Sequence, residues 1–181
     1  MLLDKNQSCL IVVDIQERLA PAMYDGGAEA IRNAAILMQA AQRLGVPVLV
    51  SEQYPRGLGR TVPQLAEFMP ADGPVEKLEF ACPSNAGFAE KLKLLDKKQV
   101  VIAGMEAHIC VLQTALKLRA QGFEVFVAAD AVASRKQSSM DHAFSRIKDA
   151  GGAIITTEMA VFEWLERAGT DDFKALQPLI A

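Results

Sequence analysis

Short apolar runs alternate with longer amphipathic stretches along the chain. Cys9–Val13 (CLIVV) is apolar throughout, which is typical of a strand buried on both faces of a sheet. Ala28–Leu44 instead has helical spacing, with its apolar residues on one side, and Gly45 follows as a helix stop. Val46–Val50 is the next strand, with Pro47 near its start, where a missing N–H is tolerated. The same alternation predicts strands at Pro74–Leu78, Gln99–Ala103, Phe123–Ala128 and Ala153–Ile155, and helices at about 84–95, 109–120, 140–149 and 158–167.

The order of these elements predicts the fold class. Six strands alternating with helices favour an α/β protein of three layers, α/β/α, in which a six-stranded parallel sheet is covered on both faces, as in Rossmann-like folds. Because the 181 residues contain no repeat, low-complexity stretch or linker, we expect residues 1–181 to form one domain. Ligands of such sheets bind beyond the carboxyl ends of the strands, so the candidate chemistry is sought there.

Composition and charge argue against several classes of function. A formal net charge of -3 disfavours nucleic acid, whose binding needs a basic surface, and also disfavours an anionic membrane surface. The apolar runs stay well short of the roughly 18 residues that cross a bilayer. The start MLLDKNQSCLIVVD lacks the features of a signal peptide. Three widely spaced cysteines disfavour a disulfide framework, so the sequence predicts a cytoplasmic protein.

Three residues whose side chains are suited to catalysis lie at or just after the ends of predicted strands. Asp14 ends the first strand, Lys77 ends the short third strand, and Cys110 lies where a helix begins after the fourth strand. The positive end of a helix lowers the pKa of a thiol and so favours the nucleophilic thiolate. Each residue also has a purely structural interpretation, as a turn-capping aspartate, a solvated lysine and a buried cysteine. The pattern alone does not decide between the two interpretations.

Other residues and motifs point less clearly to chemistry. Cys9 belongs to a buried strand, and Cys82 lies in a loop with no predicted base beside it. The two histidines, His108 and His142, lack metal-ligand spacing. The first strand is followed by DIQER instead of a dinucleotide-binding glycine motif, RGLGRT lacks the Lys-Ser/Thr of a phosphate-binding loop, and no serine lies in a G-x-S-x-G motif. We therefore expect neither a cofactor nor a metal.

Three separated motifs resemble the isochorismatase-like cysteine hydrolases. They are IVVDIQERL, the Lys77-x-x-Phe80 element and GMEAHICVLQTA, and they occur in that family's order. The similarity continues through the Gly122-Phe123 turn and the VAADAVASR segment, so it extends over the whole chain. The long connection SEQYPRGLGRTVPQL, rich in Gly, Pro and Arg, is most similar to the isochorismatase domain-containing proteins, a subgroup found in animals and bacteria.

The resemblance implies a site as well as a fold. It implies a six-stranded parallel sheet and a catalytic triad whose three positions are occupied by Asp14, Lys77 and Cys110. It also implies a cis peptide bond between Met105 and Glu106, and an oxyanion hole formed by the backbone N–H groups of Glu106 and Cys110. The implied activity is hydrolysis of a small amide or a related acyl compound.

Two departures from the family's patterns limit the range of expected substrates. Nicotinamidases carry an Asp-x-His metal motif after the second strand, where this chain reads SEQYP, which argues against a metal and against nicotinamide. Isochorismatases proper lack the cysteine, so the thiol argues against isochorismate as substrate. The candidate pocket-lining residues are Gln16, Glu52, Tyr54, Phe80 and His108. Because relatives commonly form dimers or larger assemblies, we expect a homo-oligomer, a dimer or a tetramer.

Two other functions remain open. The fold could serve as a binding or regulatory module that retains the triad without turnover, which a panel of small amides would reveal. A thiol-based redox protein could use Cys110 and Cys82, although the chain has no C-x-x-C pair and the two thiols would have to lie within bonding reach.

Overall fold

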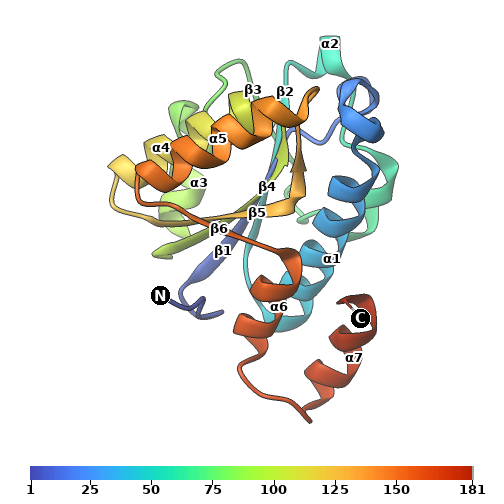
Figure 1. The fold of residues 1–181 in the computed structure, drawn as a ribbon, viewed down its shortest axis with the longest axis vertical. Coiled ribbons are helices and arrows are strands. Elements are labelled where there is room, and N and C mark those ends of the chain that lie inside the picture. Colours follow the sequence, from blue (N-terminus) through green and yellow to red (C-terminus); the bar gives the residue numbers. More distant parts are fainter. Residues whose placement is uncertain (181) are drawn as a thin grey trace.

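A computed structural model describes residues 1–180 of the chain. At its centre is a parallel sheet of six strands in the order β3-β2-β1-β4-β5-β6 (Figure 1). The strands are β1 (Ser8–Val13), β2 (Val48–Gln53), β3 (Val75–Lys77), β4 (Gln99–Met105), β5 (Glu124–Ala133) and β6 (Ala153–Ile155). The order reverses between β1 and β4, so their carboxyl ends flank the switch point at which open α/β sheets bind ligands. The predicted α/β/α fold with a six-stranded parallel sheet is confirmed.

Helices cover both faces of this sheet. They are α1 (Ala28–Leu44), α2 (Pro55–Leu58), α3 (Ala86–Leu94), α4 (Leu112–Ala120), α5 (Gln137–Asp149), α6 (Thr157–Leu165) and α7 (Asp171–Ile180). The long α1 packs on one face together with α6 and α7, whereas α3, α4 and α5 cover the other face (Figure 1). Within residues 1–180, no helix combines the length and the apolar character that crossing a membrane requires.

Two apolar clusters, one on each face of the sheet, explain why the central strands are unbroken apolar runs. In β1, Leu10 and Val12 belong to the cluster beneath α1, while Ile11 and Val13 belong to the cluster beneath α4. Alternate residues of a strand face opposite sides, so burial of both sides leaves no solvent-facing position for a polar residue. Each fully buried side chain of this size stabilises the fold by about 1.5–3 kcal/mol.

Several element boundaries differ from the predictions because strand pairing is not visible in local periodicity. β2 begins at Val48, not Val46, and continues through polar residues to Gln53, because its end pairs with β3. β5 extends beyond the predicted end at 128, because a register shift lets residues 132–133 pair with residues 104–105 of β4. The helix after β4 opens with a π-helical turn at Ala107–Val111, ahead of the predicted start at 109. The sequence pattern predicts neither α7 nor the first turn of α5.

Candidate active site

Asp14 and Lys77 form a buried ion pair at the carboxyl edge of the sheet. Asp14 directly follows β1 with a φ of 52°, and its N–H donates to the carbonyl oxygen of Ser51 at 3.1 Å. Lys77 is the last residue of β3. Its Nζ donates to Asp14 Oδ2 at 2.7 Å, and neither side chain is exposed to solvent. Charges buried in this way need further hydrogen bonds to offset their lost hydration.

Ser51 and Gln53 supply those hydrogen bonds from β2. Ser51 Oγ donates to Asp14 Oδ1 at 2.7 Å, and Gln53 Oε1 accepts from Lys77 Nζ at 2.7 Å. Lys77 Nζ also donates to the carbonyl oxygen of Phe80 at 3.3 Å. Gln53 and Lys77 are register partners in the parallel β2–β3 pair, so their side chains project to the same face. The sequence pattern does not single out Ser51 or Gln53, although polar residues two apart at a strand end are a usable signal.

Cys110 lies close to this pair, in the π-helical turn that leads into α4. The residue is only 5% exposed. Burial, followed by the negative charge of Asp14, raises the pKa of Cys110 well above its usual range, and the Lys77 charge opposes this only in part. The expectation of a lowered thiol pKa is thereby corrected, because burial disfavours the charged thiolate. The resting side chain is a protonated thiol, and Asp14 lies close enough for its negative charge to act on it.

The turn that carries the thiol is tied to the chain just beyond β5. The peptide bond between Met105 and Glu106 is cis. The Glu106 carboxylate accepts two hydrogen bonds from Arg135, at 2.8 and 2.9 Å. Nδ1 of His108 lies 2.9 Å from Ser134 Oγ, so this candidate pocket residue also contacts the segment just after β5. Two consecutive residues after β5 therefore hold the backbone on which the predicted oxyanion hole lies.

Gln16, another pocket candidate, holds the long connection after β2 in place. Its Nε2 donates to the carbonyl oxygens of Gln53 at 3.1 Å and Gly59 at 2.7 Å, and its Oε1 accepts from the N–H of Gln53 at 2.8 Å. The side chain is fully buried. These bonds engage both polar atoms of the carboxamide within the fold and argue against a direct contact with substrate.

Glu52 lies on the opposite face of β2 from the two residues that contact the ion pair. Its carboxylate accepts from the N–H and the hydroxyl of Thr61 at 2.7 and 2.8 Å, and from Arg60 at 2.9 Å. Arg60 also donates to Glu76, the register partner of Glu52 on β3, at 2.6 Å. Glu52 therefore anchors the connection that follows β2, and its carboxylate points away from the thiol side of the sheet.

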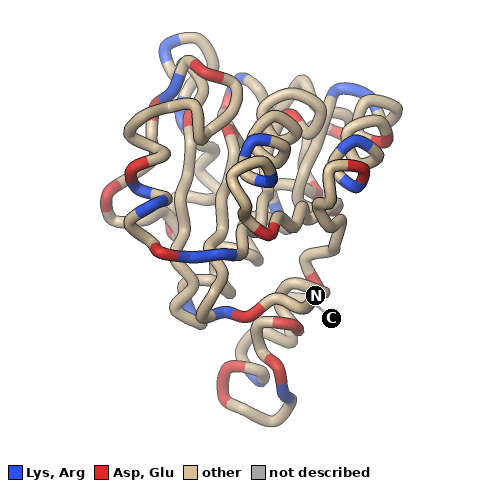
Figure 2. The backbone as a smooth tube through the Cα atoms, turned by 90° about the vertical axis from the view of Figure 1, so that its left-hand side faces the viewer, with Lys and Arg blue, Asp and Glu red and all other residues tan. Residues whose placement is uncertain are grey.

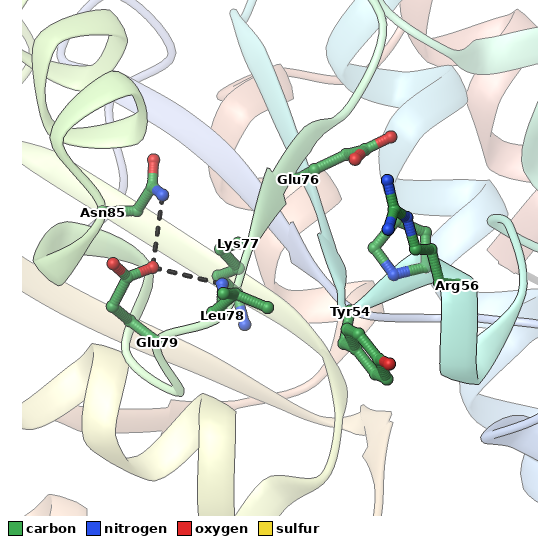
Figure 3. A pocket seen from close by; sticks show the side chains of 8 residues that line it. Tyr54, Arg56, Glu76, Lys77, Leu78, Glu79 and Asn85 are labelled. Carbon is green, nitrogen blue, oxygen red and sulfur yellow. Dashed lines mark hydrogen bonds between the residues drawn. The ribbon is translucent and has the colours of Figure 1, made fainter.

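A pocket of about 420 Å³ opens beside β3, next to Lys77 (Figure 3). It is lined by Tyr54, Pro55, Arg56, Glu76, Lys77, Leu78, Glu79 and Asn85. Tyr54 and Arg56 lie on one side, while Glu79 and Asn85 lie on the other, joined by a hydrogen bond of 3.2 Å (Figure 3). Two of the pocket candidates are aromatic. Tyr54 lines this pocket and is 51% exposed, whereas Phe80 is not among the lining residues and is 53% exposed.

Comparison with known proteins decides the family. The family model described as the isochorismatase domain matches residues 8–159. The chain belongs to the isochorismatase family. Isochorismatase domain-containing protein 2 of Danio rerio is 36% identical to it over 176 residues, which cover 96% of this chain and 87% of that protein.

Two solved structures extend the comparison with this isochorismatase-family chain. The MAR1 ribonuclease of Caenorhabditis elegans has a TM-score of 0.92 at 34% identity, covering 99% of this chain and 92% of that one. The ycaC gene product of Escherichia coli, an octameric hydrolase of unknown specificity, has a TM-score of 0.92 at 25% identity, covering 99% and 90%. The chain therefore has the hydrolase-like fold of the isochorismatase family.

The cysteines of this family member occupy three different environments as free thiols. Cys9 lies within β1, and burial raises its pKa to about 12. Cys82 is fully buried at the start of a short 3-10 turn, and its Sγ donates to Ser51 Oγ at 3.4 Å. Cys82 thus joins the hydrogen bonds around Asp14, which the sequence does not indicate. No group of three His, Cys, Asp or Glu side chains suited to a metal ion occurs within the described 180 residues.

Proposed function

We propose that this isochorismatase-family chain hydrolyses a small amide or a related acyl compound. Cys110 is the nucleophile, Asp14 the general base, and Lys77 the cation that balances the Asp14 charge. The observation that carries the proposal is the fully buried Lys77–Asp14 ion pair beside a buried thiol, at the switch point of the sheet. Burying an ion pair adds little to stability, so a catalytic role accounts for it better than a structural one.

The first half of the reaction forms a thioester. Asp14 takes the thiol proton as the Cys110 sulfur attacks the carbonyl carbon, and the carbonyl π electrons move to the oxygen. The backbone N–H groups of Glu106 and Cys110 stabilise this oxyanion, and one such donor lowers the barrier by about 3–4 kcal/mol. The intermediate collapses, the bond to the leaving group breaks, and Asp14 returns the proton to the leaving nitrogen or oxygen.

Water completes the cycle. Asp14 takes a proton from a water molecule as the water oxygen attacks the thioester carbon. Collapse releases the carboxylic acid, and Asp14 returns the proton to the departing sulfur. Because burial and the Asp14 charge raise the pKa of Cys110, free thiolate is scarce at neutral pH. Attack on the carbonyl carbon therefore requires a base that accepts the thiol proton.

RNA is a second candidate substrate, because a structurally similar relative is a ribonuclease. The net charge of -3 argues against RNA as the substrate of this chain, and its Lys and Arg residues are interspersed with Asp and Glu over the molecule (Figure 2). Binding of RNA draws most of its affinity from a basic surface that meets the phosphates. A binding module that retains the three residues without turnover is the other alternative.

An activity screen tests the proposal. The protein is assayed with primary amides, carbamoyl compounds, esters and single-stranded RNA, beside Cys110→Ala, Asp14→Asn and the control Cys9→Ala. Turnover of an amide or ester that falls by at least about a hundredfold in the first two variants supports the proposal. RNA cleavage without small-molecule turnover, or turnover that survives Cys110→Ala, overturns it. Ligand binding without any turnover identifies a binding module instead.

We also propose that the chain forms homo-oligomers in the cytoplasm. The similar Escherichia coli protein is octameric. Three large apolar side chains near the pocket, Tyr54, Leu78 and Phe80, are 51%, 71% and 53% exposed and are suited to an interface. The free thiols are compatible with a reducing compartment. Light scattering that gives only the 19.6 kDa monomer at micromolar concentration contradicts self-association.

A further inference from the structure

A chain of buried hydrogen bonds leads from Cys82 to the proposed general base. The Cys82 thiol donates to Ser51 Oγ at 3.4 Å, and Ser51 Oγ donates to Asp14 Oδ1 at 2.7 Å. The other carboxylate oxygen accepts from Lys77. All four residues are buried. The mechanism above uses Asp14 and Lys77 but leaves Ser51 and Cys82 without a role.

The donors and acceptors fix the direction of this series of hydrogen bonds, from Cys82 through Ser51 to Asp14. A carboxylate only accepts, so the one hydroxyl proton of Ser51 points to Asp14. The Ser51 oxygen is then free to accept, and the Cys82 S–H is the donor that reaches it. Burial raises the pKa of Cys82, so this thiol keeps its proton through the neutral range. Each oxygen of Asp14 thereby receives its own donor.

The sheet register brings these groups together. Ser51 is the register partner of Val13, and its carbonyl oxygen accepts the N–H of the next residue, Asp14, at 3.1 Å. Ser51 thus contacts Asp14 through both its backbone and its side chain. Cys82 is held from the other side, because its N–H donates to Thr114 Oγ1 on α4 at 3.0 Å. The backbones of Ser51 and Cys82 are therefore both held where their side chains reach the carboxylate and the Ser51 hydroxyl, respectively.

We propose that Ser51 is a positioning residue for Asp14, and that Cys82 orients the Ser51 hydroxyl and is not a second nucleophile. This inference deepens the proposed function, on which it rests. The Ser51 hydrogen bond favours the ionised carboxylate, which is the form that accepts the Cys110 proton. It also fixes the plane of the carboxylate, so the proton transfer has a defined geometry.

Alkylation of Cys110 by iodoacetamide tests this inference without a known substrate. The titratable and charged groups around the Ser51 hydroxyl are Asp14, Lys77, Cys82 and Cys110. The rate at Cys110 is measured by peptide mass mapping from acid to neutral pH. Alkylation slows in acid once the base that accepts the thiol proton is lost, so the rate profile has an acidic limb.

The variants are expected to move this limb in a graded way. Ser51→Ala should move it to higher pH by about one unit, the equivalent of one hydrogen bond to a charged group. Cys82→Ala should move it less in the same direction, while Cys82→Ser keeps a donor and should match the parent. Ser8→Ala is the matched control. Ser8 is equally buried, but its hydroxyl contacts Asp4 and Gln99 at the amino edge of the sheet, so its loss should leave the limb in place.

Two comparisons decide the outcome. If Ser51→Ala folds and its acidic limb is not moved, the positioning role of Ser51 is overturned. If Ser51→Ala does not fold, identical rate profiles for Cys82→Ala and Cys82→Ser overturn that role instead. Asp14→Asn separates this failure from that of the proposed function. If the limb persists in Asp14→Asn, Asp14 is not the base and both proposals fail. If the limb disappears there but stays unmoved in Ser51→Ala, only the inference fails.

Discussion

The Lys77 ammonium lies 2.7 Å from the Asp14 carboxylate, and both side chains are completely buried. Removing one member leaves an uncompensated buried charge, so Lys77→Met is expected to lower the free energy of unfolding by about 3–5 kcal/mol. Combining it with Asp14→Asn removes both charges and should lower stability by less than the sum of the single losses. Urea unfolding, followed by fluorescence of the single tryptophan, Trp164, measures these values. Strictly additive losses would show that the pair is not coupled.

The buried thiols make the free energy of unfolding depend on pH in the alkaline range. Burial raises the pKa of Cys9 to about 12 and also raises the pKa values of Cys82 and Cys110. In the unfolded chain a thiol loses its proton near pH ~8.5, while the folded protein still holds it. The unfolded state then binds fewer protons, so stability is complete below that pH and falls above it, by up to about 1.4 kcal/mol per pH unit for each thiol.

Urea unfolding at a series of alkaline pH values, with a reductant present, measures this slope. Cys9→Ala is the informative variant, because it removes one thiol that is remote from the proposed chemistry. Its stability should fall less steeply with pH than that of the parent. Equal slopes for the two proteins would mean that Cys9 does not contribute to the pH dependence.

The ion pair between Arg135 and Glu106 holds the turn that carries the proposed nucleophile. Arg135→Gln leaves the Glu106 carboxylate, which is only 7% exposed, without its two charged donors. We expect roughly tenfold slower alkylation of Cys110, because the turn loses its fixed geometry. Arg43→Gln is the matched control. It breaks an exposed ion pair between α1 and α7, in which Arg43 Nε lies 3.0 Å from Asp172 Oδ1, and should change the alkylation rate little. Equal rates in the two variants would remove Arg135 from the support of the site.

Gly104 allows β4 to approach β1 beside Asp14. Its φ is +136°, and an added methyl carbon would clash with the carbonyl oxygen of Val13. Gly45 also has a positive φ, +73°, but an added methyl there meets no described atom within 4 Å. Gly45→Ala is expected to cost about 1–2 kcal/mol from backbone strain alone. Gly104→Ala should cost about 1–3 kcal/mol more from overpacking, as measured by urea unfolding. Similar losses in both variants would contradict a close β1–β4 approach.

Part of the candidate site is predictable from sequence because of a general property of parallel sheets. Asp14 and Lys77 are 63 residues apart, yet both lie at strand ends, and those ends share one edge of the sheet. The partners of the pair are less accessible to prediction. Ser51 lies 37 residues from Asp14, and Cys82 lies 31 residues from Ser51. Contacts of this kind depend on register and on the path of a connection, which no local pattern encodes.

The sequence by itself determined the alternation of strands and helices, the parallel sheet and the edge that carries the polar residues, because periodicity and turn residues act locally. Only the tertiary structure decided which face each residue of β2 serves. Glu52, a candidate from sequence, contacts Arg60 and Thr61, while its neighbours Ser51 and Gln53 contact the ion pair. The tertiary structure also decided the state of the Cys110 thiol. Burial raises the pKa of this thiol, and that burial comes from elements distant in sequence that pack around the turn.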